Sequence, residues 1–310
     1  MKIEAGRVRA SSTALGDAFI RAFHLEDSPC PVFSDTVADA LLTDAERERF
    51  TAGAQKSVGR RRPDLAADPR AAVRYWIEEM SVAAPHVLLR ARYTEDVLRW
   101  QAAQKQAQYV LLGAGLDSFA LRRPAWARDI RVFEVDHPAT QELKRSRVAR
   151  LTDAAPGLPR WVPADLGDER LAEVLSGVRE LDPTLPTVVA WCGVTYYLEE
   201  PAIDAVLGDL REVFTGELTV VLDYWQAEYL DEQRQDAEVR SMFASVRRND
   251  EPFVTGFTPA RLAALAASRG YAVAEDLSAV DVVARIPGDD GARVRPHPIG
   301  RLARLRRAPA

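Results

Sequence analysis

Cysteine is scarce in this 310-residue sequence, which contains only two. Cys30 and Cys192 lie far apart, and neither has a histidine or a second cysteine at metal-ligand spacing. This spacing argues against a disulfide framework and against a structural zinc site. We therefore expect no bound metal.

Basic stripes and long apolar runs are also missing. The formal net charge is −5, and only four of the 41 basic residues are lysines, so nothing in the sequence suggests a nucleic-acid partner. No run approaches the ~20 apolar residues that a membrane span needs. The first 16 residues lack the apolar segment typical of a secretory signal. We expect a cytoplasmic protein that binds neither nucleic acid nor a membrane.

The apolar content is ordinary, with 47% hydrophobic residues, and is large enough to bury a sizeable core. Before residue 105 the apolar residues recur at helical spacing. They predict helices over 14–23, 71–80 and 86–100, the last two separated at Pro85. The polar, proline-punctuated segment 57–70 predicts a surface loop. We expect residues 1–104 to form a helical cap.

After residue 105, short apolar runs alternate with helical segments such as 201–214 and 258–270. Alternation of this kind predicts a parallel sheet with right-handed crossovers. The tail is expected to add two edge strands, at 271–277 and 299–307. The fold class is therefore α/β, a doubly wound, mostly parallel seven-stranded sheet with a Rossmann-like core over 105–310. The five parallel strands are predicted at 109–112, 130–135, 160–162, 188–192 and 218–223.

A glycine turn follows the first of these strands. The sequence Gly113-Ala114-Gly115 leads toward a helix, so its backbone N–H groups can face an adenosyl ligand. A plain strand-to-helix turn would have the same sequence. Asp136 ends the next strand, 23 residues after Gly113, where doubly wound folds place the acid that binds both ribose hydroxyls. Capping of the helix that begins at Pro138 is a second role for Asp136, less favoured and compatible with the first.

Two further positions refine the type of nucleotide site. Dinucleotide-binding turns carry a third glycine, and Ser118 stands at that position here. The sequence therefore disfavours a nicotinamide enzyme. Asp165 follows the third strand, where its carboxylate could accept a hydrogen bond from an adenine amino group while the Leu166 backbone faces the ring. A simple turn role for Asp165 remains open.

With these residues assembled, the chain resembles the S-adenosylmethionine-dependent methyltransferases of the leucine carboxyl methyltransferase superfamily. It is most similar to the actinobacterial branch that includes tetracenomycin-type polyketide O-methyltransferases. The matching segments are STALGDAFIRAFH, PVFSDTVADALL, LLRARYTEDVL, YVLLGAGLDSFALRRP, RVFEVDHPATQELKR, VPADL, WCGVTYYL and EPFVTGFTPARLAAL.

The resemblance implies S-adenosyl-L-methionine as cofactor and S-adenosyl-L-homocysteine as product. It implies that Arg90, rather than Arg92, pairs with the methionyl carboxylate of the cofactor. Gly113 and Gly115 would pass close to the methionyl part. The remaining implied contacts are those of Asp136 with the ribose and of Asp165 and Leu166 with the adenine.

One position departs from the family pattern. Cys192, preceded by Trp191, stands where the carboxyl methyltransferases proper carry a glutamate. We expect both residues to line the cofactor pocket. Because of this change, a small-molecule acceptor is favoured over a protein carboxylate.

The predicted activity is methyl transfer to oxygen of a carboxylate or hydroxyl in secondary metabolism. A carboxylate needs no general base, whereas a hydroxyl benefits from one, and the candidates are His24 and Tyr197. Carbon or nitrogen methylation of an aromatic or indole-type acceptor is an alternative. An NAD-dependent oxidoreductase and a non-catalytic cofactor-binding protein are alternatives of other classes.

Overall fold

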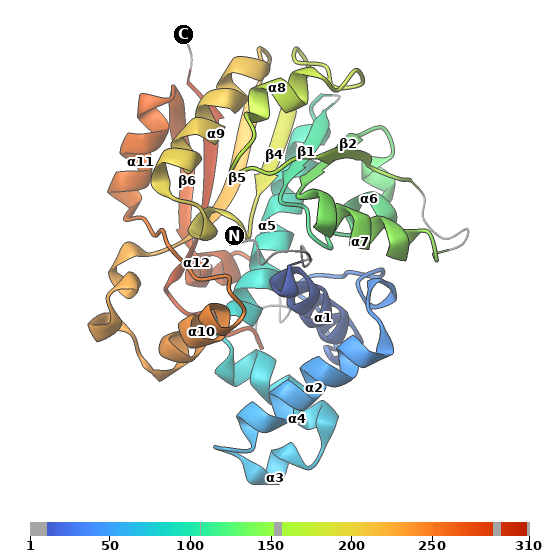
Figure 1. The fold of residues 1–310 in the computed structure, drawn as a ribbon, viewed down its shortest axis with the longest axis vertical. Coiled ribbons are helices and arrows are strands. Elements are labelled where there is room, and N and C mark those ends of the chain that lie inside the picture. The colour runs from blue at the N-terminus through green and yellow to red at the C-terminus, as the bar shows by residue number, and fades with distance from the viewer. Residues whose placement is uncertain (1–10, 106, 152–156, 288–292, 309–310) are drawn as a thin grey trace.

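A seven-stranded sheet forms the centre of the molecule (Figure 1). The computed structural model describes residues 11–105, 107–151, 157–287 and 293–308. The strand order is β3-β2-β1-β4-β5-β7-β6. The strands are β1 (Gln108–Leu112), β2 (Arg131–Asp136), β3 (Arg160–Pro163), β4 (Thr187–Trp191), β5 (Leu218–Trp225), β6 (Tyr271–Ser278) and β7 (Gly300–Arg307).

The doubly wound prediction is confirmed. Strands β1 to β5 pair in parallel, and β7 runs antiparallel to both β5 and β6. The prediction of two edge strands in the tail is wrong for β7, which lies inside the sheet between β5 and β6. Its buried residues Leu302, Ala303 and Leu305 are covered from both faces, whereas β6 is the edge.

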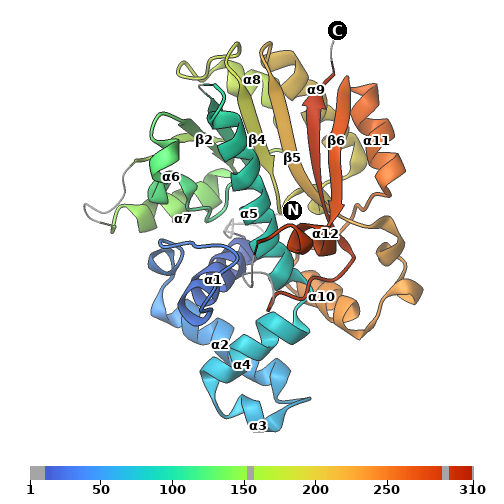
Figure 2. The ribbon, with the colours of Figure 1, turned by 180° about the vertical axis from the view of Figure 1, so that it is seen from behind.

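Helices cover both faces of the sheet. On one face lie α8 (Leu171–Ser176), α9 (Glu200–Val213) and α11 (Pro259–Ser268), whose apolar side chains join those of Val110 and Val189 in one core. On the other face lie α5 (Ala83–Ala102), α6 (Phe119–Arg122), the 3-10 turn η3 (Ala125–Ala127) and α12 (Ala279–Ala284), as Figure 2 shows. The remaining elements after residue 105 are α7 (Pro138–Val148), η4 (Thr195–Tyr197), η5 (Ala227–Leu230), η6 (Glu232–Arg234) and α10 (Ala237–Arg248).

The N-terminal helices lie beyond the carboxyl ends of the parallel strands (Figure 1). They are α1 (Ser12–Asp27), η1 (Asp39–Leu41), α2 (Asp44–Val58), α3 (Pro63–Ala66), α4 (Pro69–Tyr75) and the π-helical turn η2 (Trp76–Met80). Leu15, Phe19 and Ile20 of α1 pack against Leu88 of α5 in a third apolar core. The C-terminal half of α5, however, packs on the sheet through Val97 and Leu98. A domain boundary at residue 104 remains a prediction.

Two predictions that treated prolines as helix breaks are wrong. The predicted loop 57–70 holds the end of α2, all of α3 and the start of α4, and both Pro63 and Pro69 occupy first helical turns. Pro85 does not interrupt a helix either, because α5 begins at Ala83. In a first turn the missing proline N–H costs nothing, since no carbonyl is available to pair with it.

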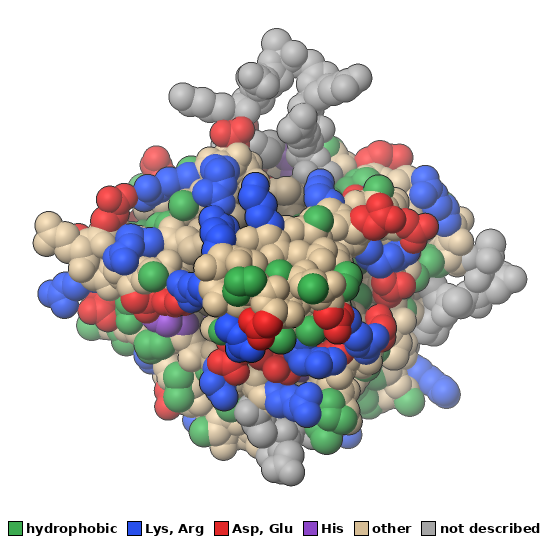
Figure 3. Space-filling model, turned by 90° about the horizontal axis from the view of Figure 1, so that it is seen from below, with side chains coloured by type: hydrophobic (Ala, Val, Ile, Leu, Met, Phe, Trp, Pro, Cys, Tyr) green, Lys and Arg blue, Asp and Glu red, His purple; other side chains and the backbone are tan. Residues whose placement is uncertain are grey.

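Charges of both signs are interleaved on the face that these N-terminal helices turn away from the sheet (Figure 3). Arg47 pairs with Asp44 at 2.5 Å and Arg62 with Asp64 at 2.7 Å. Exposed pairs of this kind contribute little stability.

Candidate cofactor and acceptor site

A cavity of about 450 Å³ opens at the carboxyl ends of β1, β2 and β4, between the sheet and helices α1 and α5. The chain leaves β1 toward β2 on one side and returns through β4 on the other, so the cavity lies where the strand order reverses, the usual ligand site of such sheets. The structure brings most of the predicted site residues to its wall: Arg90, Gly113, Gly115, Asp136, Asp165, Leu166, Cys192 and Tyr197.

The glycine turn forms the floor of this cavity. Gly113 and Gly115 have φ angles of +69° and +53°. Residues other than glycine rarely adopt this backbone conformation. A Cβ atom on Gly113 would also lie 2.3 Å from Cγ2 of Val194. The turn therefore requires glycine on both conformational and steric grounds.

Asp136 is held beside this turn. Its carboxylate accepts hydrogen bonds from the N–H groups of Gly115 at 2.5 Å and His137 at 2.7 Å. Burial raises the pKa of Asp136 above its usual value, although both N–H groups oppose this change. The N-cap of α7 is His137, whose Nδ1 accepts the N–H of Ala139 at 3.2 Å. The Asp136 carboxylate thus faces the cavity rather than capping the helix.

Asp165 lies at the far end of the cavity with Leu166 and Gly167. Its Oδ1 accepts the N–H of Gly167 at 3.0 Å, and its Oδ2 lies 3.7 Å from Nε2 of His137. A turn role and a cavity-lining role therefore coexist in Asp165.

Arg90 is the centre of a buried polar cluster. One guanidinium nitrogen donates to Oη of Tyr196 at 2.8 Å and to Asp223 at 3.2 Å, and the other donates to Asp17 of α1. Burial disfavours the charge, but Tyr196, Asp17 and Asp223 outweigh it and raise the pKa of Arg90. Arg92, by contrast, lies outside the cavity and pairs with Asp96 at 2.7 Å.

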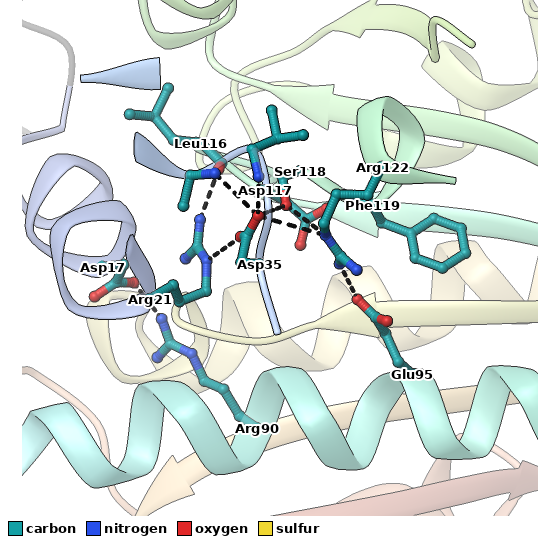
Figure 4. A network of polar contacts seen from close by, with 12 residues as sticks. Asp17, Arg21, Asp35, Arg90, Glu95, Leu116, Asp117, Ser118, Phe119 and Arg122 are labelled. Atoms are coloured by element: carbon teal, nitrogen blue, oxygen red, sulfur yellow. Dashed lines mark hydrogen bonds and ion pairs between the residues drawn. The ribbon is translucent and has the colours of Figure 1, made fainter. Parts of the chain in front are cut away.

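A second polar network, centred on Asp35, ties α1 to the glycine turn (Figure 4). Asp35 accepts from Arg21 at 2.8 Å and from Ser118 at 2.5 Å, while Arg21 also donates to the carbonyl of Leu116 at 2.7 Å. Ser118 in turn accepts from Arg122 at 2.8 Å. The serine that stands in place of a third glycine thus joins the segment after α1 to the start of α6.

No role for Asp35 was expected from the sequence. The sequence feature that could have indicated a role for Asp35 is Arg21, which shares a helical face with the buried residues Ala18 and Leu15. A charged residue on a buried face needs a partner, and Asp35 in PVFSDT was the nearest carboxylate along the chain outside α1.

The open end of the cavity is lined by Tyr197, Leu198, Pro252 and Val254, together with polar groups of α1 and Glu251. The carboxylate of Glu251 accepts from the hydroxyls of Ser12, at 3.4 Å, and Thr13. Burial raises the pKa of Tyr197 above its usual value, so the phenol stays protonated.

Two predicted site residues do not reach the cavity. His24 is buried, its Nε2 accepts the N–H of Val32 at 2.9 Å, and burial lowers its pKa to about 4. Trp191 points into the core on the other face of the sheet, because neighbouring strand residues face opposite ways. Cys192 does line the cavity, and burial raises the pKa of its thiol to about 12.

The residues that the structure describes offer neither a metal centre nor a membrane-spanning helix. No group of three or more His, Cys, Asp or Glu side chains there could hold a metal ion. Within the same ranges, no helix is both long and apolar enough to cross a membrane.

A family model described as leucine carboxyl methyltransferase matches residues 14–211, more than half of the chain. The chain belongs to this family. The strand order, with β7 inserted antiparallel between β5 and β6, is that of class I methyltransferases. Membership of this family decides against the nicotinamide alternative.

Curated relatives are similar over much of their length. A Bacillus subtilis protein named "Putative S-adenosyl-L-methionine-dependent methyltransferase YktD" is 28% identical over 277 residues, covering 88% of this chain and 90% of that one. A Frankia alni protein with the same descriptive name is 33% identical over 210 residues, covering 66% of this chain and 65% of that one.

A solved structure supports the fold assignment. The chain is similar to a DUF574-family protein from Streptomyces avermitilis, with a TM-score of 0.58, 17% identity and coverage of 97% of this chain and 98% of that one. At this identity the likeness concerns the fold alone.

Proposed function

We propose that this methyltransferase, whose cofactor is S-adenosylmethionine, methylates a hydroxyl oxygen of a small-molecule acceptor. The single observation that carries the proposal is the makeup of the open end of the cavity. It is lined by Glu251, Thr13 and Tyr197. The carboxylate of Glu251 can only accept hydrogen bonds, and each of the two hydroxyl groups can donate one.

A carboxylate acceptor fits this end poorly. It would lie near the carboxylates of Glu251 and Asp17, which repel it. Of the two arginines of the described cavity wall, Arg21 is paired with Asp35, and Arg90, which contacts Asp17 and Asp223, is the residue expected to bind the carboxylate of the cofactor itself. A hydroxyl can instead donate to a carboxylate and accept from the Tyr197 phenol.

The cofactor site is proposed at the other end. Asp136 would accept from the ribose hydroxyls, and Asp165 with Leu166 would contact the adenine. When bound, the cofactor supplies a methyl group on a positively charged sulfur, which is already activated for displacement. The protein's task is then to hold the acceptor oxygen in line and to exclude water.

A hydroxyl must also lose its proton. Because His24 lies outside the cavity and Tyr197 stays protonated, the proton acceptor we propose is Glu251, which already accepts hydrogen bonds from two hydroxyls of α1. Such general-base catalysis contributes about 10²–10⁴-fold to rate.

Turnover on matched acceptors tests this function. We expect S-adenosylhomocysteine to form with planar phenols but not with the corresponding benzoic acids. Glu251→Gln should lower kcat for the phenol by about 10²-fold or more while leaving cofactor affinity unchanged. Asp231→Asn, which removes an exposed carboxylate outside the cavity, is the matched control. Preferred turnover of the carboxylic acids would reverse the acceptor assignment.

A further inference from the structure

A second cavity, of about 410 Å³, lies between α5, α12 and strands β6 and β7, and it shares no lining residue with the first. We propose that this second cavity binds an anionic small molecule with an apolar body, of the class of the aromatic carboxylates. Its volume lies within the range of small-molecule sites in proteins, about 300–1,000 Å³. The proposal concerns a site separate from the one at which methyl transfer is proposed.

Helix α5 separates the two cavities. Its residues that line the second cavity recur at the three- and four-residue spacing of one helical face. They are Tyr93, Asp96, Val97 and Trp100. The residues of α5 that line the first cavity lie on another face and are Arg90, Ala91, Thr94 and Glu95. A ligand in the second cavity would therefore contact α5 without occupying the proposed cofactor site.

The second cavity offers an apolar surface to the body of a ligand. Val97 of α5 lines it together with Val282 and Ile286 from the region of α12, and these three side chains belong to the apolar core on this face of the sheet. Trp100, which also lines the cavity, is 48% exposed. An apolar group that covers this surface removes it from water, which favours binding in proportion to the area buried.

The charged side chains that line this cavity carry one positive charge in excess. Arg92 pairs with Asp96 at 2.7 Å, so these two charges balance. Glu275 is shared by two guanidinium groups, those of Arg285 at 2.6 Å and Arg304 at 3.4 Å. Burial opposes the charge of Glu275, but its hydrogen bonds and both arginines outweigh this effect and lower its pKa, so the carboxylate is ionised. A single negative charge on a ligand would balance the second arginine.

Arg304 is the group that would bind the anion. It extends from β7 on the face that α5 and α12 cover, as Leu302 does, because alternate residues of a strand share a face. Its side chain is 20% exposed, and its Nε is buried with no hydrogen-bond partner among the residues that the structure describes. A buried donor without an acceptor costs free energy. The guanidinium presents its N–H groups in a fixed fork that matches the two oxygens of a carboxylate.

Calorimetry with 2-naphthoate and its uncharged amide, 2-naphthamide, tests the site in the full-length protein saturated with S-adenosylhomocysteine. We expect the wild type to bind the naphthoate more tightly. Arg304→Gln should weaken naphthoate binding by about 10- to 100-fold, through loss of charge-assisted hydrogen bonds, and leave naphthamide binding unchanged. Trp100→Ala should weaken binding of both ligands, since it removes apolar surface. Unchanged affinity for S-adenosylhomocysteine reports an intact fold in both variants.

The matched control is Arg261→Gln, which removes a guanidinium paired with Glu200 outside both cavities and should leave both affinities unchanged. Unchanged naphthoate binding by Arg304→Gln would overturn the proposal, because the anion would then bind elsewhere. Equal affinity of the wild type for the two ligands, or no naphthoate binding at millimolar concentration, would also overturn it. A wild-type dimer that Trp100→Ala converts to monomers, measured by light scattering, would assign the cavity to a second copy of the chain instead.

Discussion

At the scale of single residues, the cavity contains ionisable side chains whose pKa values are shifted by burial and by neighbouring hydrogen-bond donors. Asp136 is the clearest case. It is largely buried, two backbone N–H groups point at it, and its pKa is nevertheless raised by burial. A buried carboxylate with remaining acceptor capacity gains from a ligand that supplies hydroxyl donors.

Replacing Asp136 with alanine should therefore weaken binding of S-adenosylhomocysteine by about 1–3 kcal/mol, since charge-assisted hydrogen bonds to the ribose are lost. Isothermal titration calorimetry measures the effect directly. The control is Asp204→Ala. It removes a carboxylate of α9 that pairs with Arg269, and it should leave the affinity for S-adenosylhomocysteine unchanged. An Asp136→Ala protein with wild-type affinity would show that the ribose binds elsewhere.

At the scale of elements, the sequence was most informative where both faces of a strand are buried. Strands β1, β4 and β5 are buried along their whole length and appear as short apolar runs because helices cover each face. Helix α2 was not predicted, because only Ala54 and Val58 of this helix are buried. Its sequence therefore shows almost no helical periodicity of apolar residues. The position of β7 in the sheet depends on its pairing with β5, about 80 residues away. The local pattern of apolar residues does not predict a pairing between such distant segments.

The candidate site divides in the same way. Gly113, Gly115 and Asp136 follow from local motif spacing, and the structure brings them together. The contacts of Asp35 depend on how α1 and the segment after it meet the core, which a single sequence does not encode locally. The expected site role of Trp191 failed for a different reason, because a shift of one residue along a strand changes the face.

Asp35 joins elements, so its loss should be felt by a whole helix. Asp35→Asn removes the buried carboxylate shared by Arg21, Ser118 and Arg122 and should cost about 3 kcal/mol of unfolding free energy. We expect amide hydrogen exchange in α1 to become faster while that in β1 and β4 changes less. Asp39→Asn, which breaks an exposed pair with Arg47 in the neighbouring turn, is the control. Equal exchange in the two variants would contradict a link between cap and core.

At the scale of the whole molecule, burial shifts the pKa values of several groups in the direction that favours their neutral forms. Burial raises the pKa of Glu95 and of Glu134 to about 7, although Arg122 and Lys144 oppose it, and lowers that of His24 to about 4. The two glutamates bind more protons in the folded state, so they reduce stability as pH rises between their unfolded and folded pKa values. His24 acts in the opposite sense, because the unfolded chain binds its proton first.

The contribution of His24 can be isolated by comparison with His24→Gln, which keeps an acceptor for the N–H of Val32 but does not titrate. The folded pKa lies below the unfolded value of 6.5, so this part of the stability is present above pH 6.5 and is lost as pH falls toward 4. Between pH 7 and pH 5 the wild type should lose about 2 kcal/mol more unfolding free energy than the variant, measured by urea denaturation. The glutamates titrate equally in both proteins and cancel in the difference. If the two proteins respond identically to pH, His24 titrates alike in the folded and unfolded chains, and its burial in α1 carries no electrostatic cost.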